Sequence, residues 1–131
     1  MSTYKFSKQE IIEDILEYLE NTDGFYGCDL HTEVFNTDYI IGTTKAKEAL
    51  ERYGVFDALN KVQMYEVYNF GEVTTDSSDP EKLANMLYYI KSEEYLYSLK
   101  GEIHDILNDH WGDELEKKDI KKLIELFKKE L

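Results

Sequence analysis

The sequence predicts an all-α fold, in which residues 1–131 form a single-domain helical bundle of five to seven helices with an acidic surface. Apolar residues recur every three or four positions through most of the chain, which is the spacing of one helix face. Short breaks rich in Gly, Asp, Ser and Thr separate these periodic segments. The length of 131 residues suits one domain, and 42% hydrophobic with 33% charged residues is typical of a folded, water-soluble chain.

The first helix is predicted over "FSKQEIIEDILEYLEN", residues 6–21. Ser7, with Glu10 three residues later, has the pattern of a capping box, in which the side chain of each residue bonds the backbone N–H of the other. The glycines and the aspartate in "NTDGFYG" end the helix. The predicted core face consists of five aliphatic residues: Ile11, Ile12, Ile15, Leu16 and Leu19.

Two more helices are predicted before the middle of the chain, over residues 29–36 and 43–54. The second has Thr43 or Thr44 as its N-cap and Gly54 just past its end, where glycine is favoured because it adopts a positive φ without steric cost. The segment "TDYIIG" between them is interpreted as a buried linker, with a short extended piece as the alternative.

A further helix is predicted from residue 55 to Gly71, which ends it. The stretch that follows, residues 71–79, is rich in Thr, Ser and Asp and is predicted to be a loop, with an extended pair at Val73 and Thr74. The core face expected for the helix has near-helical spacing: Val55, Phe56, Leu59, Val62, Gln63 and either Tyr65 or Glu66.

The last third of the chain predicts one long helix and one closing helix. Asp79 as N-cap and Pro80 at the first helical position start the long helix, which Ser92 or Gly101 breaks or kinks. Residues 112–131 form a neutral, Lys-rich closing helix whose apolar stripe either caps the core or forms a homodimer.

The net charge limits the classes of partner. The chain has 28 acidic and 15 basic residues, a net charge of −13, and the last 20 residues hold six of each, so the first 111 residues carry the whole excess. Direct binding to nucleic acid or to an anionic membrane is disfavoured, because both need a cationic surface. A basic partner protein is favoured, although the same charge also serves simple solubility.

Acids without interleaved bases are the most unusual feature of the pattern. No Lys or Arg lies between Lys8 and Lys45, and none lies between Lys61 and Lys82. A helix that is acidic only for solubility usually alternates its signs, since like charges one turn apart repel. A row of carboxylates one turn apart could instead mimic a nucleic-acid backbone. The candidate partner-binding residues are Glu10, Glu13, Asp14, Glu17, Glu20, Asp23, Glu72, Asp76 and Asp79.

No motif of catalysis or cofactor binding is present, so no enzymatic activity, cofactor or metal is expected. Gly-rich phosphate loops and the HExxH motif are both missing from the sequence. Four residues resemble metal ligands, but their spacing is better explained by a solvated helix end: His104, Asp105, Asp109 and His110. Cys28 with His31 lacks the further groups that a nucleophile needs.

The expected compartment of the protein is the cytoplasm. If a phage encodes the protein, this is the cytoplasm of the host cell. One cysteine cannot form an internal disulfide, which favours a reducing compartment. The N-terminal residues lack the layout of a signal peptide, and no apolar run is long enough to span a membrane.

Residues 36–90, "NTDYIIGTTKAKEALERYGVFDALNKVQMYEVYNFGEVTTDSSDPEKLANMLYYI", resemble a family of small acidic proteins of phages and prophages. The resemblance lies in YIIGT, YGVFDAL, NFGEV with the TD that follows, and DPEKLANMLYYI, and it implies no reaction and no catalytic residue. "DLHTEVFNTDYIIGTTKAKEALERYG" is also similar in layout to the helical DNA-mimic antirestriction proteins of the Ocr type. The neutral, Lys-rich last helix departs from the acidic tail of that type.

The charge pattern and the resemblance together predict a phage-type inhibitor of a host DNA-targeting defence system, either anti-CRISPR or antirestriction. It would bind the nucleic-acid-binding site of a basic host protein, a CRISPR effector or a restriction enzyme, without catalysis. The alternative is an immunity or antitoxin-like protein that neutralises a basic nuclease or toxin, and an enzyme built on His104, Asp105 and Asp109 is the third reading.

Overall fold

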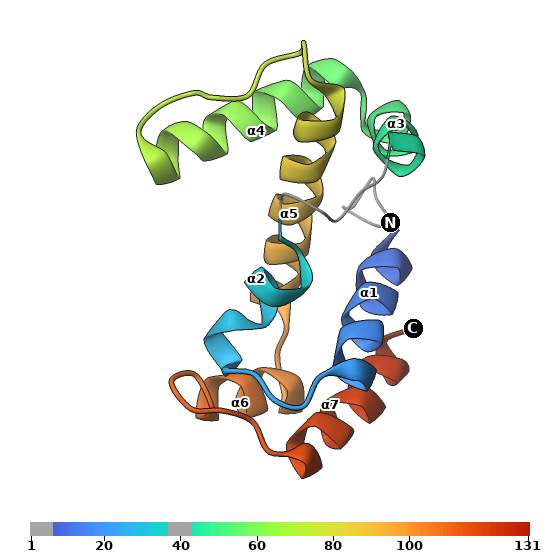
Figure 1. The fold of residues 1–131 in the computed structure, drawn as a ribbon, viewed down its shortest axis with the longest axis vertical. Helices are drawn as coiled ribbons and strands as arrows, with labels where there is room; N and C mark the ends of the chain where they lie inside the picture. Colours follow the sequence, from blue (N-terminus) through green and yellow to red (C-terminus); the bar gives the residue numbers. More distant parts are fainter. Residues whose placement is uncertain (1–6, 37–42) are drawn as a thin grey trace. The chain divides into compact units, whose positions relative to one another are not determined.

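The computed structural model of the protein describes residues 7–36 and 43–131, with side chains from residue 47 onward in the second range. These residues form helices joined by short loops, with no strand beyond an isolated bridge between Tyr26 and Glu114 (Figure 1). The all-α prediction is therefore confirmed. The elements are α1 (Lys8–Asn21), the 3₁₀ helix η1 (Gly27–Asp29), α2 (Leu30–Val34), α3 (Thr43–Tyr53), α4 (Val55–Phe70), α5 (Pro80–Ser98), α6 (Glu102–Asp109) and α7 (Lys117–Glu130).

The chain divides into two compact units. Unit 1 takes in Phe35–Glu94, which covers α3, α4 and most of α5. Unit 2 takes in Ser7–Val34 and Tyr95–Leu131, which covers α1, η1, α2, the last residues of α5, α6 and α7. The boundary falls inside α5, so the backbone passes from one unit to the other within a continuous helix. The single domain predicted for residues 1–131 stays a prediction.

In unit 2, α1 packs along α7 and also contacts α2 (Figure 1). All five aliphatic residues of the predicted α1 core face are buried, as the spacing indicated. From α7, Ile120, Leu123 and Phe127 are buried. Ser7 is the N-cap residue of α1, but its side chain makes no capping hydrogen bond, so the capping box was predicted wrongly on that side. The helix is instead held by the burial of its apolar face.

The segment after α1 is tied to the loop after α6 by backbone hydrogen bonds. The Gly27 N–H donates to the His110 carbonyl at 2.7 Å, and the Leu115 N–H donates to the Phe25 carbonyl at 2.8 Å. A Cβ on Gly27 would lie 2.2 Å from the Leu107 carbonyl oxygen, a distance that no side chain tolerates. Glycine is required there for close approach of two backbones, a role beyond the helix break expected from the sequence.

In unit 1, two glycines with positive φ bound α4, as predicted. Gly54 has φ +93° between α3 and α4, and Gly71 has φ +79° after α4, where its N–H donates to the Val67 carbonyl. The helix α3 begins at Thr43, and the predicted capping side chains of Thr43 and Thr44 lie outside the described side chains. The predicted linker at residues 37–42 lies outside the described residues altogether.

The predicted core face of α4 is wrong in part. Its buried residues are Ala58, Val62 and Glu66, whereas Val55 and Phe56 are exposed, Phe56 to 90%. The buried positions are four residues apart and so form a narrow stripe on the helix. That stripe contains one small residue, one β-branched residue and one carboxylate. Because it is not a row of large apolar residues, the spacing of apolar residues could not predict it as the buried side.

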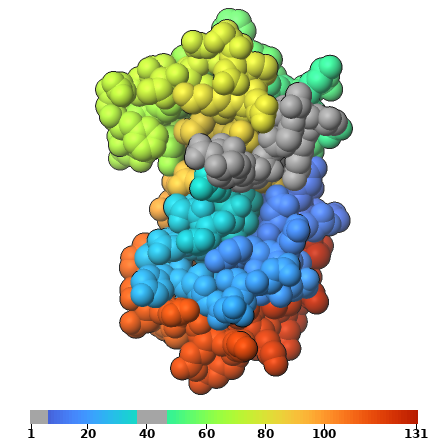
Figure 2. Space-filling view, viewed as in Figure 1, coloured from blue at the N-terminus to red at the C-terminus, as the bar shows by residue number. Residues whose placement is uncertain are grey.

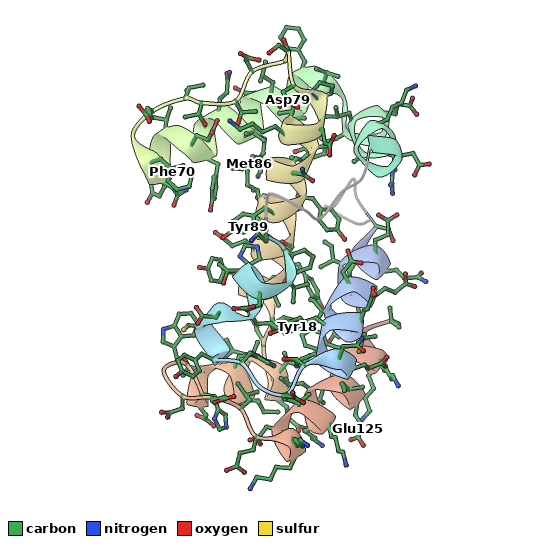
Figure 3. The ribbon with its side chains drawn as sticks, in the orientation of Figure 1. Tyr18, Phe70, Asp79, Met86, Tyr89 and Glu125 are labelled. Carbon is green, nitrogen blue, oxygen red and sulfur yellow. The ribbon has the colours of Figure 1, made fainter. Side chains whose placement is uncertain are left out.

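The structure after α4 agrees with most of what the sequence predicts for the loop and for the start of α5. Residues 72–75 form no strand, and the extended pair predicted at Val73 and Thr74 stays a prediction. Asp79 caps α5, because its Oδ1 accepts the Lys82 N–H at 3.0 Å (Figure 3). Of the two breaks considered, Gly101 separates α5 from α6, with φ +81°. Ser92 lies within the continuous helix.

Candidate partner-binding surfaces

Five carboxylates occupy the outer side of α1, opposite its buried stripe, and this set is called the acidic face of α1: Glu10, Glu13, Asp14, Glu17 and Glu20. Glu13, Glu17 and Glu20 are exposed, and Glu10 and Asp14 are half-buried. At about 100° and 1.5 Å per residue the five lie within an arc of about 120° and follow one another along the helix axis. The structure therefore brings together the row of acids that the sequence predicts on α1.

Two lysines lie near the ends of this face. Lys128 of α7 lies 3.9 Å from Glu20, and Lys8 at the start of α1 pairs with Glu130 of α7 at 3.3 Å. Both pairs are exposed, and such pairs contribute about 0–1 kcal/mol and exchange partners readily. Among the described residues, Glu17 has no ion-pair partner, so its carboxylate remains open to a cation from elsewhere.

The sixth candidate of the first half, Asp23, is exposed in the turn after α1 and also belongs to unit 2. In that turn the Thr22 hydroxyl donates to the Gly24 carbonyl at 3.1 Å, and the Tyr18 and Phe25 rings meet edge to face with centroids 5.8 Å apart. These contacts fix the turn that follows the acidic face of α1. Asp23 lies in that turn, three residues after Glu20.

The other three candidates lie in the loop of unit 1, and two of them already serve the backbone. Asp76 accepts the Ser78 N–H at 2.8 Å and the Ser78 hydroxyl, and these hydrogen bonds lower the pKa of its carboxyl. Asp79 caps α5, as described above. Glu72 is exposed beside them. The nine candidates thus form two groups, six in unit 2 and three in unit 1.

The residue that organises this loop is Glu66, which the sequence pattern placed only as one of two alternatives on the α4 core face. Its carboxylate is 2% exposed and accepts the Thr75 N–H and the Thr75 hydroxyl, each at 3.1 Å, and the Thr74 hydroxyl. Burial raises its pKa, but the hydrogen bonds from Thr74 and Thr75 outweigh burial and leave the pKa lowered. Gln63 adds a bond to the Thr75 carbonyl at 3.0 Å.

A shallow groove of about 550 Å³ lies in unit 1 where α3, the start of α4 and the start of α5 meet. Its walls combine apolar side chains with charged ones of both signs and include no cysteine, histidine or serine. The lining residues are Lys47, Leu50, Glu51, Val55, Asp79, Pro80 and Glu81.

The residues considered for metal binding or nucleophilic chemistry do not converge. Within residues 7–36 and 43–131, no three His, Cys, Asp or Glu side chains are placed to hold a metal ion. His104 lies 3.7 Å from its neighbour Asp105 and is exposed. Burial and the adjacent Asp29 raise the pKa of the Cys28 thiol, the opposite of what an activated nucleophile needs.

Among the described residues, no helix is both long enough and apolar enough to cross a membrane. Comparison with protein-family models, with curated proteins and with solved structures gave no match to the chain. The resemblances to small acidic phage proteins and to Ocr-type mimics therefore stay expectations from the sequence.

Proposed function

We propose that the protein inhibits a host DNA-targeting defence system, a CRISPR effector or a restriction enzyme, by covering its nucleic-acid-binding site. The observation that carries the proposal is the acidic face of α1, a row of five carboxylates on a 14-residue helix whose other side is buried. The phage-protein resemblance of residues 36–90 adds to it. A phage-encoded inhibitor would work in the cytoplasm of the host cell.

The physical basis is the spacing and sign of the charges. Carboxylates three or four residues apart on a helix rise by about 5 Å per step, within a factor of two of the phosphate spacing along one DNA strand. Lysine and arginine side chains that normally hold phosphates would pair with this row. The net charge of −13 would speed the encounter with a cationic groove and make the association sensitive to salt.

One lysine of unit 2 lies near the C-terminal end of the row. The helix α7 packs under α1 and supplies Lys128 near Glu20, an exposed contact of 3.9 Å. A Lys or Arg of the target could replace such a contact with little loss of free energy, because an exposed ion pair contributes little to stability. Inhibition in this scheme needs one protein per target site and involves no turnover.

The proposal is tested by reversing the sign of the three exposed carboxylates of the row. The variant Glu13→Lys/Glu17→Lys/Glu20→Lys is compared with Glu48→Lys/Glu51→Lys/Glu125→Lys, which changes the net charge equally at exposed positions of other helices. Each tagged protein captures partners from a host lysate, the retained proteins are identified, and inhibition of the purified partner's DNA binding is titrated.

We expect the α1 variant to lose inhibition by at least about tenfold and the control variant to keep most of it. Inhibition by the α1 variant that equals the wild type at moderate salt would overturn the proposal. A captured toxin or toxin nuclease encoded beside the protein's gene would instead identify an immunity protein.

A further inference from the structure

The outer side of α4 exposes large apolar side chains, and this set is called the apolar face of α4: Phe56, Met64, Val67, Tyr68 and Phe70. Phe56 and Tyr68 are each 90% exposed, and Met64 is 65% exposed. Atoms of the C-terminal half of α4 lie at the surface of unit 1 in the space-filling view (Figure 2), and Phe70 marks the last turn of the helix (Figure 3). Val73, half-exposed in the following loop, extends the set.

Helical geometry places most of this set opposite the core. At about 100° per residue, Phe56, Met64 and Val67 point away from the buried stripe of Ala58 and Val62, and Tyr68 lies on the same side. Phe70 lies nearer the buried stripe and meets the Tyr65 ring edge to face, with centroids 6.1 Å apart. The apolar face is therefore a true outer surface of α4.

An outer helix surface of a water-soluble unit is normally polar, and one that exposes several large apolar side chains is typical of an interaction site. The set is also rich in aromatic residues and methionine, the residue types that are enriched at the centres of protein interfaces. The buried Glu66 and its bonds to Thr74 and Thr75 fix the loop that borders the C-terminal end of the face. The C-terminal end of the apolar face is therefore held in place before a partner binds.

The charges at the borders of the apolar face indicate the chemistry of its partner. Asp57 is exposed next to Phe56, and Glu72 is exposed two residues after Phe70. The one lysine of α4, Lys61, lies one turn from Asp57 and from Met64, but its charge is already paired with Glu94 of α5. An apolar surface with acidic borders is complementary to apolar side chains that are flanked by Lys or Arg. A second copy of this chain, with net charge −13, would be repelled by the same borders.

We propose that the apolar face of α4 is the docking site for a partner protein's amphipathic segment, one with apolar anchors and basic flanks. The segment would lay its anchors between Met64 and Tyr68 and direct its cations to Asp57 and Glu72. The inference goes beyond the inhibition proposed above, because that function uses α1 of unit 2 whereas this site uses α4 of unit 1. Either one can fail without the other.

The probe is a dye-labelled helical peptide of about 18 residues, with Leu and Phe on one face and Lys and Arg at both ends. A second peptide keeps the apolar face and replaces the cations with Glu. Binding of each peptide to the full chain is measured by fluorescence anisotropy at about 0.15 M salt, where charges more than about 8 Å apart are largely screened. The variant Met64→Ser/Tyr68→Ser removes the centre of the face.

The matched control is Tyr97→Ser/Leu131→Ser, which removes two exposed apolar side chains of unit 2. We expect the Met64→Ser/Tyr68→Ser protein to bind the basic peptide at least about tenfold more weakly than wild type, and the control to stay within about twofold. The acidic peptide should bind wild type at least about tenfold more weakly than the basic one.

A charge variant separates the two parts of the surface. Asp57→Asn/Glu72→Gln should weaken basic-peptide binding by severalfold and reduce its salt dependence, while the apolar anchors still contribute. Sedimentation of the wild type should give a monomer. Failure of the basic peptide to bind, equal binding by Met64→Ser/Tyr68→Ser, or a wild-type dimer that this variant dissolves would each overturn the proposal.

Discussion

The helices α1 and α4 are similar in length, 14 and 16 residues, yet they distribute their side chains in opposite ways. The helix α1 buries five aliphatic residues and presents carboxylates outward. The helix α4 buries a carboxylate, Glu66, and presents aromatic residues and methionine outward. The comparison teaches that one helix presents a row of carboxylates to solvent, whereas another presents large apolar side chains.

The two helices also differ in what stabilises them. Apolar burial against α7 and α2 holds α1, and it needs no particular polar partner. On its buried side α4 depends on one ionised group whose lone pairs are filled by Thr74, Thr75 and their backbone. A buried carboxylate is tolerated only while such hydrogen bonds remain.

The largest effect is expected from truncation in the α1 core. Ile15 is fully buried, and Ile15→Ala should lower the free energy of unfolding by about 2–5 kcal/mol through lost burial and the cavity left behind. Urea unfolding followed by circular dichroism measures it. A loss below about 1 kcal/mol would show that α1 does not depend on its apolar stripe as described.

A smaller loss is expected when the carboxylate of α4 is replaced. Glu66→Gln keeps the size of the side chain but removes an ionised acceptor, and it should cost about 1–3 kcal/mol. Because the pKa of Glu66 is lowered on folding, its stabilisation is full above the unfolded value of about 4.3 and declines as the pH falls below that value.

Unfolding of wild type and Glu66→Gln across pH 7 to 3 tests this dependence. The difference between the two proteins should shrink toward the acidic end of the range, because the wild-type carboxylate then becomes protonated. A difference that stays constant or grows toward pH 3 would contradict the assignment of Glu66 as an ionised acceptor.

The smallest effects are expected on the two outer surfaces. Phe56→Ser and Glu17→Lys remove an exposed ring and an exposed carboxylate, and each should change the free energy of unfolding by no more than about 0.5 kcal/mol. Thermal unfolding monitored by circular dichroism is sufficient. A Phe56→Ser loss above about 2 kcal/mol would show that this ring is part of the core after all.

The sequence predicted the fold class and most helix boundaries because they depend on local signals. Gly54, Gly71 and Gly101 end or separate helices through a positive φ, and Asp79 caps α5, so each acts on its immediate neighbours in the chain. The core face of α1 was equally clear, since its apolar and acidic residues alternate with the period of a helix.

The sequence could not predict features that depend on distant partners. Glu66 is buried because a loop folds back on it, and Gly27 is needed because the Leu107 carbonyl lies close by. Because α4 has apolar residues on both sides, the sequence did not show which side is exposed. The period of apolar residues alone does not say which side of a helix is buried. For the site, the acidic row on α1 and the cap made by Asp79 were predictable, whereas the hydrogen bonds from Ser78 to Asp76 were not.

The most direct test of the proposed inhibition asks whether duplex DNA and the protein can occupy the captured target together. Labelled DNA is bound to the purified target, and the protein is titrated in while DNA release and complex mass are followed. We predict that one molecule of the protein releases the DNA from each site. We also predict that the protein concentration needed for half-release rises in proportion to the DNA concentration. A ternary complex, in which the target keeps its DNA while the protein is bound, would contradict mimicry of the nucleic-acid backbone.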